Sequence, residues 1–231
     1  EGRGPRYIAD RGFGPQVLLN FEEGRVEEWL EGRAPSHQEI RSAETIPQIA
    51  RTLRRFHDRT GLNHNDLHHN NMLMMQDGDL QFLDFEYAGT LDPTYDIANH
   101  FNEWMYPYSG AEPHLYQLGL YPSLFQRRTF CEHYLGGSKG KGTVVDDFLQ
   151  EVERRRQDSH AFWVRWAECS PSEFNNKYLA ARKQLLHGQS TGLTGKEPGL
   201  RFDSGTPPEA GWTVAETVNA MLQDRRLHTW A

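Results

Sequence analysis

Three polar side chains in the middle of the chain have the types and spacing of a phosphoryl-transfer site. Asp66 and Asn71 stand five positions apart, and Asp84 follows thirteen residues after Asn71. An aspartate can take the proton of an acceptor hydroxyl, while an asparagine oxygen and a second carboxylate can ligate magnesium on nucleotide phosphates. We therefore predict Asp66 as the catalytic base and Asn71 and Asp84 as metal ligands.

The same run of residues permits two other interpretations. Asn and Asp are common in solvated turns, where their side chains bond the local backbone. His64 and His68 are four apart, which is the spacing of zinc ligands on a helix. Asp66 lies between them and an apolar strand follows, and both features argue against a helix. An exposed or structural role is therefore favoured for both histidines.

Short apolar runs must position these polar residues. Two runs span residues 71–75 and 80–85 and are joined through Asp77-Gly78, a strong signal for a β-hairpin. This hairpin places Asp84 at a strand end, beside the loop that holds the predicted base. Upstream, residues 17–21 and 25–30 are typical of a second hairpin.

The rest of the chain has the pattern of a helical protein. Apolar residues recur at intervals of three and four between Ile46 and His57, which predicts a helix that ends at Gly61. Ser36 with Glu39 has the pattern of a capping box for a shorter helix before it. Further helices are expected over residues 92–104, 123–135, 145–168 and 173–187. Residues 188–211 contain six Gly and three Pro, which indicates a surface excursion or linker, and Thr213 begins a final helix.

Composition narrows the class of partner. The 231 residues carry a formal charge of −7, which gives no electrostatic reason to expect nucleic acid or an anionic membrane surface. Small molecules are the expected partners. Cys131 and Cys169 do not have a zinc-like or disulfide-rich spacing. No apolar run approaches the roughly 20 residues that span a bilayer. We expect a cytoplasmic protein without membrane insertion.

The segment from Leu62 to Tyr108 resembles the choline/ethanolamine kinase family, and among its members the choline kinases most closely. The motifs that carry the resemblance are His64-Asn65-Asp66, Asn71, Asp84-Phe85-Glu86-Tyr87 and the run from Asp96 to Trp104. The similarity extends over residues 6–187. It implies an α/β fold of the α+β type, like that of protein kinases, with a largely helical C-terminal lobe, a catalytic β-hairpin and a remnant of the N-lobe sheet.

The resemblance also implies a division of the chain and a reaction. Residues 1–30 would form the end of the N-lobe and the hinge, 31–187 the C-lobe, and 188–231 the Gly/Pro-rich excursion with a terminal helix. The reaction would be ATP- and Mg²⁺-dependent phosphorylation of the hydroxyl of choline, a step of phosphatidylcholine synthesis in this family. The hinge residues that would contact the nucleotide are Glu27, Glu28, Trp29 and Leu30. A homodimer is left open.

Choline makes particular demands on its site. A quaternary ammonium has no N–H to donate, so its recognition needs aromatic faces and negative charge. The residues expected around it are Tyr87, Asp96, Glu103, Tyr108, Trp163, Trp166 and Tyr178. Ordinary core packing is the alternative for Trp163 and Trp166, and a solvated helix face is the alternative for Glu103. For Asp96 we favour a different role, in which it accepts backbone hydrogen bonds beneath the catalytic loop.

Two questions follow from the resemblance. Phe85 and the run Trp104-Met105-Tyr106 favour choline, with an ethanolamine kinase or a dual enzyme as the alternative. A kinase of this fold also needs a glycine-rich loop and a lysine that contacts the phosphates. We expect both upstream of Glu1, which would itself pair with that lysine. A catalytically silent amine-binding protein or fragment is the alternative of another class.

Overall fold

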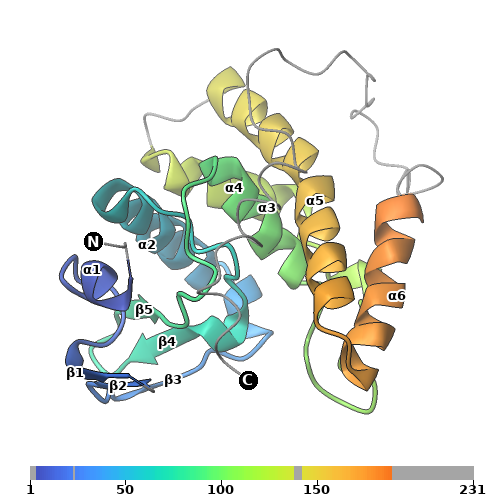
Figure 1. The fold of residues 1–231 in the computed structure, drawn as a ribbon. Coiled ribbons are helices and arrows are strands. Elements are labelled where there is room, and N and C mark those ends of the chain that lie inside the picture. The colour runs from blue at the N-terminus through green and yellow to red at the C-terminus, as the bar shows by residue number, and fades with distance from the viewer. Residues whose placement is uncertain (1–3, 23, 138–141, 189–231) are drawn as a thin grey trace. The chain divides into compact units, whose positions relative to one another are not determined.

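The computed structural model describes residues 4–22, 24–137 and 142–188. These residues form two compact units. The first unit contains the described residues up to Pro107 together with Gln117–Arg156, and the second contains Tyr108–Tyr116 with the described residues from Gln157 onward. The elements, shown in Figure 1, are α1 (Pro5–Ala9), β1 (Val17–Phe21), β2 (Gly24–Glu27), β3 (Gly32–Arg33), η1 (Glu39–Arg41), α2 (Thr45–Thr60), η2 (His69–Asn71), β4 (Met72–Met75), β5 (Leu80–Phe82), α3 (Pro93–Glu103), η3 (Leu118–Leu120), α4 (Leu124–Tyr134), α5 (Thr143–Cys169) and α6 (Glu173–Gly188).

Both predicted hairpins are present. β1 pairs antiparallel with β2, and β4 pairs antiparallel with β5. The turn between β4 and β5 contains Gly78 at a φ of +89°, and Asp77 Oδ1 accepts the Asp79 N–H at 2.9 Å. Asp77 and Gly78, the residues from which the hairpin was predicted, therefore form its turn.

The strands differ from prediction at their ends. The run expected to reach Phe85 ends at Phe82, because Asp84 adopts a φ of +59°, which a strand does not accommodate. The upstream run expected to reach Leu30 ends at Glu27. The two-residue strand β3, which pairs with β4, was not predicted. A segment this short cannot show the alternation of apolar and polar residues by which a strand is recognised.

Five of the predicted helices are confirmed as α2, α3, α4, α5 and α6, with ends shifted by a few residues. α2 ends where Gly61 adopts a φ of +63° and donates its N–H to the carbonyl of His57. Asp92 caps α3 by accepting the Thr94 N–H at 2.8 Å. The short α1 was not predicted, and Pro5 suits its first turn because a first-turn N–H has no helical partner. The segment after Ser36 forms only the three-residue η1.

The core of the first unit lies between its helices and the β3-β4-β5 sheet. α2 packs along α4, as Figure 1 shows. The buried face of α2 contains Ile49, Leu53 and Phe56, none of which is exposed. It repeats every three to four residues, as the sequence pattern requires for a half-buried helix. This packing sets the position of the loop that leaves the C-terminal end of α2.

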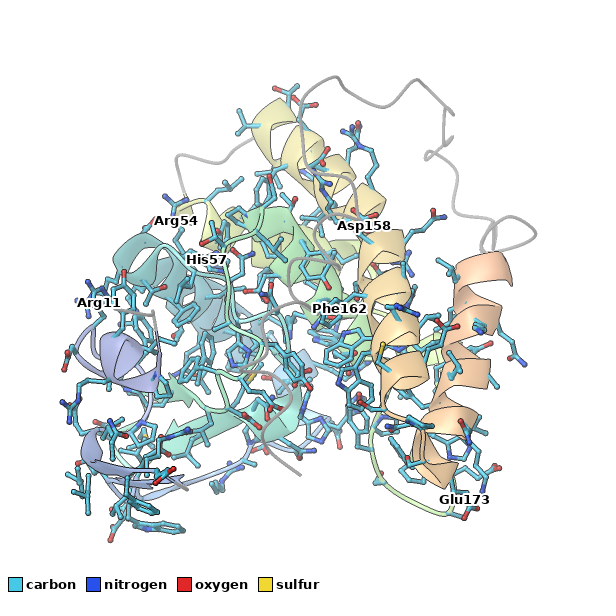
Figure 2. All side chains as sticks on the ribbon, viewed as in Figure 1. Arg11, Arg54, His57, Asp158, Phe162 and Glu173 are labelled. Carbon is cyan, nitrogen blue, oxygen red and sulfur yellow. The ribbon has the colours of Figure 1, made fainter. Side chains whose placement is uncertain are left out.

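The second unit is built on a helix pair. The C-terminal part of α5, which carries Phe162, runs beside α6, which begins at Glu173 (Figures 1 and 2). Lys183 on α6 pairs with Glu168 on α5 at 2.8 Å. Glu1, the segment 189–211 and the helix expected from Thr213 lie outside the described residues. The predicted division at residues 30 and 187 stays a prediction.

Gly14 is a point at which this packing can be tested. It adopts a φ of +66°, and a Cβ would lie 2.6 Å from Phe85 Cε2, on a ring that itself stacks on Phe56. We expect Gly14→Ala to lower the free energy of unfolding by about 2–3 kcal/mol in urea. Gly78→Ala is the matched control, since its φ is also positive but no atom lies within 4 Å. It is expected to cost about 1 kcal/mol. Equal losses would contradict a packing role for Gly14.

Candidate active site

The loop between α2 and β4 is held in place by hydrogen bonds to Asp96. This carboxylate is fully buried on α3. Its Oδ2 accepts the His64 N–H at 2.6 Å, and its Oδ1 accepts the Asn65 N–H at 2.9 Å. Its Oδ2 also lies 2.9 Å from His57 Nε2. These contacts are those of a brace for the loop, whereas contact of Asp96 with a substrate stays a prediction.

His57 connects the brace to the helices around it. It lies on α2, as does Arg54 (Figure 2). The Nδ1 atom of His57 lies 2.7 Å from the Tyr134 hydroxyl on α4, and the Arg54 guanidinium lies over the Tyr134 ring. Burial alone would raise the pKa of Asp96, but the hydrogen bond and charge of His57, with the charge and backbone bond of His64, lower it below its ordinary value. Asp96 is therefore a carboxylate at neutral pH.

His64 is engaged on both ring nitrogens. The Asp66 N–H points to its Nδ1 at 3.4 Å, and its Nε2 lies 2.9 Å from the Leu83 carbonyl. The ring also packs against Phe85, with centroids 5.2 Å apart. Burial lowers the pKa of His64, so the ring is neutral, with Nε2 as the donor. These contacts give His64 a structural role and leave no ring nitrogen for zinc.

Asp66 and Asn71 are in direct contact. The Asn71 amide Nδ2 donates to the Asp66 carbonyl at 2.9 Å and to the Asp66 carboxylate at 3.1 Å. These two bonds identify which atom of the Asn71 amide faces Asp66: it is the donor nitrogen Nδ2. The oxygen Oδ1 is on the other side of the amide and is the atom that a cation could bind. His68 Nε2 lies 3.7 Å from the same carboxylate. Two of the three residues predicted from spacing are thus joined across a single turn of the loop.

The negative charges of three other carboxylates act on Asp66. Burial raises the pKa of Asp66 well above its ordinary value, and the charges of Glu103, Asp84 and Glu86 raise it further. Glu103 is buried near the end of α3, while Asp84 and Glu86 are exposed after β5. The pKa of Glu86 is also raised, by burial and by Asp84. Asp84 therefore lies on the same side of the molecule as the predicted base, with Glu86 as an additional charge that the spacing argument did not single out.

This surplus of negative charge fits a divalent cation. Asn71 Oδ1 and the Asp84 carboxylate are hard oxygen donors of the kind that Mg²⁺ takes. No three His, Cys, Asp or Glu side chains in the described part of the chain form a metal site by themselves. A magnesium ion at Asn71 and Asp84 would therefore need further oxygens from phosphate or water, as such sites usually do.

The predicted hinge residues follow β2. Glu27 closes the strand and pairs with Arg25, and the Glu28 N–H donates to the Gln16 carbonyl at 2.8 Å. The Trp29 side chain is 86% exposed, and Leu30 is half-buried. An exposed tryptophan here is open to a flat ring such as a nucleotide base, although the hinge role stays a prediction.

The aromatic residues predicted to hold an ammonium group gather within the second unit. The rings of Trp163 and Trp166 lie 5.5 Å apart at 73°, and those of Trp166 and Tyr178 lie 6.4 Å apart at 85°. Trp163 and Tyr178 are buried, whereas Trp166 is half-buried. Tyr178 also has Phe174 stacked beside it and the Arg182 guanidinium over its ring. Trp166 is therefore the member of the cluster with aromatic surface left for a ligand.

The remaining predicted residues are Tyr87 in the first unit and Tyr108 in the second. Both are half-buried. The Tyr87 carbonyl accepts the Asn65 amide Nδ2 at 2.8 Å, so its backbone supports the loop whatever its ring contacts. Tyr108 has a φ of +50°, an unusual conformation for a bulky residue. A substrate-binding role for either stays a prediction.

Comparison with known proteins places the chain in a family. The family model for choline/ethanolamine kinases matches residues 3–60 and 58–180. The chain belongs to the choline/ethanolamine kinase family. A probable choline kinase of Arabidopsis thaliana is 28% identical over 221 residues, which cover 71% of this chain and 64% of that protein. A choline/ethanolamine kinase of Rattus norvegicus is 28% identical over 265 residues, covering 81% and 67%. The chain thus spans less than two thirds of the Arabidopsis relative.

The fold of the family is confirmed by a solved structure. An ethanolamine kinase of Plasmodium vivax superposes with a TM-score of 0.68 at 20% identity, covering 78% of this chain and 69% of that one. The predicted kinase-like fold with a mostly helical lobe is therefore correct. No helix in the described ranges is long and apolar enough to cross a membrane. Relatives of this chain bear the names of both choline and ethanolamine kinases, so family membership by itself leaves the acceptor open.

Proposed function

We propose that this protein transfers the γ-phosphoryl group of ATP to the hydroxyl of choline and releases phosphocholine and ADP. The observation that carries the proposal is the loop in which the Asn71 amide bonds the Asp66 carboxylate, with the charges of Glu103, Asp84 and Glu86 raising the pKa of that carboxylate. Such a loop presents one base and a cluster of oxygen ligands, which are the polar parts of a phosphoryl-transfer site.

Each group has a distinct task in this reaction. Asp66 accepts the proton of the choline hydroxyl while the choline oxygen forms a bond to the γ-phosphorus. The bond between the γ-phosphorus and the oxygen that leaves with ADP breaks in the same step. Asn71 and Asp84 would hold magnesium, which would neutralise charge on the phosphates. His64 and Asp96 fix the backbone of the loop. The raised pKa of Asp66 makes it a stronger base than an ordinary aspartate, and the carboxylate is active only above that pKa.

Choline is proposed as the acceptor because of the aromatic cluster in the second unit. Trp166 offers a half-buried ring beside Trp163 and Tyr178, and an aromatic face attracts a quaternary ammonium without hydrogen bonds. Ethanolamine, whose ammonium can donate N–H bonds, would gain less from these rings. A cytoplasmic location and a homodimer stay predictions.

An assay of ATP-dependent phosphorylation tests the proposal directly. The protein in its full natural length is incubated with ATP and Mg²⁺, and choline and ethanolamine are compared as acceptors. We expect phosphocholine to form with the higher kcat/KM. Formation of phosphoethanolamine alone would overturn the choice of acceptor. Binding of either amine without any product would favour the catalytically silent protein.

The aromatic cluster yields a sharper prediction. Trp166→Ala is expected to raise KM for choline about tenfold, because a partly desolvated cation–π contact contributes about 1–2 kcal/mol. KM for ATP should not change. The same substitution at the exposed Trp29 is the matched comparison and should raise KM for ATP alone. Steady-state kinetics with each substrate varied in turn measures both. Unchanged choline affinity in Trp166→Ala would remove the cluster from the acceptor site.

A further inference from the structure

Three residues on one face of α3 hold the catalytic loop. Asp96 and His100 bond the loop itself, and Trp104 bonds His100. Asp96, His100 and Trp104 are four residues apart on α3 and at its C-terminal cap. Residues at this spacing stand one above the other on a helix. Asp96 and His100 contact the loop on the two sides of Asp66: Asp96 accepts backbone N–H groups before it, whereas His100 contacts the Leu67 carbonyl after it.

The contacts of His100 determine which ring nitrogen carries its proton. The Trp104 indole N–H, which can only donate, points to His100 Nε2 at 3.2 Å. Nε2 must therefore be the acceptor, and Nδ1 carries the proton that bonds the Leu67 carbonyl at 2.8 Å. Burial lowers the pKa of His100 to about 4, so the ring is neutral at physiological pH and retains this tautomer.

Trp104 is itself held in place. Its carbonyl lies 2.7 Å from His37 Nε2, and the Arg41 guanidinium lies over its ring, 5.2 Å from the centroid. Its side chain is almost completely buried, as are those of His100 and Leu67. Because the three residues are buried, their hydrogen bonds are shielded from solvent. The indole N–H thus orients the His100 ring, and the ring directs its Nδ1–H at the Leu67 carbonyl of the loop.

We infer that Trp104 and His100 are positioning residues for the Asp66 base: His100 holds the Leu67 carbonyl through its Nδ1–H, and the Trp104 indole N–H holds the His100 ring in place through Nε2. The inference rests on the proposed function for its kinetic consequence. Asp96 fixes the loop immediately before Asp66 and His100 fixes it immediately after. The base is therefore clamped to a single helix at both neighbouring residues, and its own side chain remains available for the acceptor hydroxyl.

Trp104→Phe tests the inference, because it retains an aromatic ring and removes the indole N–H. We expect kcat to fall about tenfold while KM for ATP and for choline stays within about twofold, since a small displacement of a base affects the chemical step more than binding. In ¹⁵N spectra, the His100 Nε2 resonance should shift because it loses the indole N–H, while Nδ1 keeps the proton bonded to the Leu67 carbonyl. His100→Asn, which presents an amide donor near the position of Nδ1, should retain more activity than His100→Leu.

Leu53→Ala is the control for a general loss of stability. Leu53 is also fully buried, but it lies on α2 and not on the α3 face of His100 and Trp104. It is expected to lower the melting temperature without lowering kcat. An unchanged kcat in Trp104→Phe, a rise of KM in step with the fall of kcat, or an unchanged His100 Nε2 resonance would each overturn the inference.

The result remains decisive if wild type phosphorylates neither amine. That outcome rejects the proposed function, and the clamp is then judged by structure alone. Amide exchange at Asn65 should be at least about tenfold faster in Trp104→Phe than in wild type, because the loop loses one of its two anchors. Equal exchange rates, or an unchanged His100 Nε2 resonance, would overturn the clamp independently of any activity.

Discussion

Replacing Asp66 with Asn is expected to lower kcat about 1,000-fold while the protein stays folded. The substitution keeps the size of the side chain but removes the atom that accepts the hydroxyl proton, and general-base catalysis contributes about 10²–10⁴ in rate. The backbone bonds that hold the loop come from Asp96 and do not involve the Asp66 side chain. KM for ATP should change little, because the nucleotide is held by other residues.

The same variant should be more stable than wild type at neutral pH. Burial and the neighbouring carboxylates raise the pKa of Asp66, so the folded state favours the protonated form. The stability from this group is present at acidic pH and is lost as the pH rises through the raised pKa. An uncharged Asn removes that cost. The activity of wild type should show the opposite trend and rise with pH through the same ionisation.

Single-turnover kinetics and thermal unfolding measure both effects. Asp77→Asn is the matched control, since Asp77 lies in the exposed β4–β5 turn and an Asn can make the same bond to residue 79. It should leave kcat and the melting temperature unchanged. Activity that survives in Asp66→Asn would remove Asp66 as the base and return the loop to a structural role.

Asp96→Ala is expected to cost about 3–5 kcal/mol of unfolding free energy. The substitution leaves the His64 and Asn65 N–H groups without their acceptor in a fully buried site, and it removes the partner of His57 Nε2. Breaking a buried charged network by removing one member has a cost of about this size. Activity should be lost along with stability, because the loop before Asp66 is no longer fixed.

A second aspartate on the same helix gives the comparison. Asp92 caps α3 by accepting the Thr94 N–H and the Thr94 hydroxyl and is exposed, so Asp92→Ala should cost only about 1 kcal/mol. Urea unfolding of the two variants measures the difference. Equal losses would mean that Asp96 is no more than a helix-terminal residue, and the brace would be rejected.

The brace also predicts a direction for the dependence on pH. The pKa of Asp96 is lowered in the folded state, so its contribution to stability is present above the ordinary value of 3.8 and is lost as the pH falls through the lowered folded value. Wild type should lose more stability than Asp96→Ala on acidification below pH 3.8. A parallel loss in both proteins would show that other carboxylates determine acid unfolding.

The sequence by itself was sufficient for features that depend on neighbouring residues. The helix over Thr45–Thr60 follows from a repeat of apolar residues, and the β4–β5 hairpin follows from Asp77-Gly78, because helix period and turn chemistry are local properties. The pair Asp66 and Asn71 belongs to the same class, since five residues of one loop suffice to bring them into contact.

The tertiary structure decided the contacts between distant residues. Asp96 reaches His64 across 32 positions and His100 reaches Leu67 across 33, and no local pattern specifies such partners. The left-handed backbone at Asp84, which ends β5 early, and the pairing of β3 with β4 likewise depend on what packs around them. The sequence thus determined which groups could do chemistry. Only the packing of α2, α3 and the sheet determined how Asp66 is held and in which direction its pKa moves, because both depend on burial and on charges brought together from separate segments.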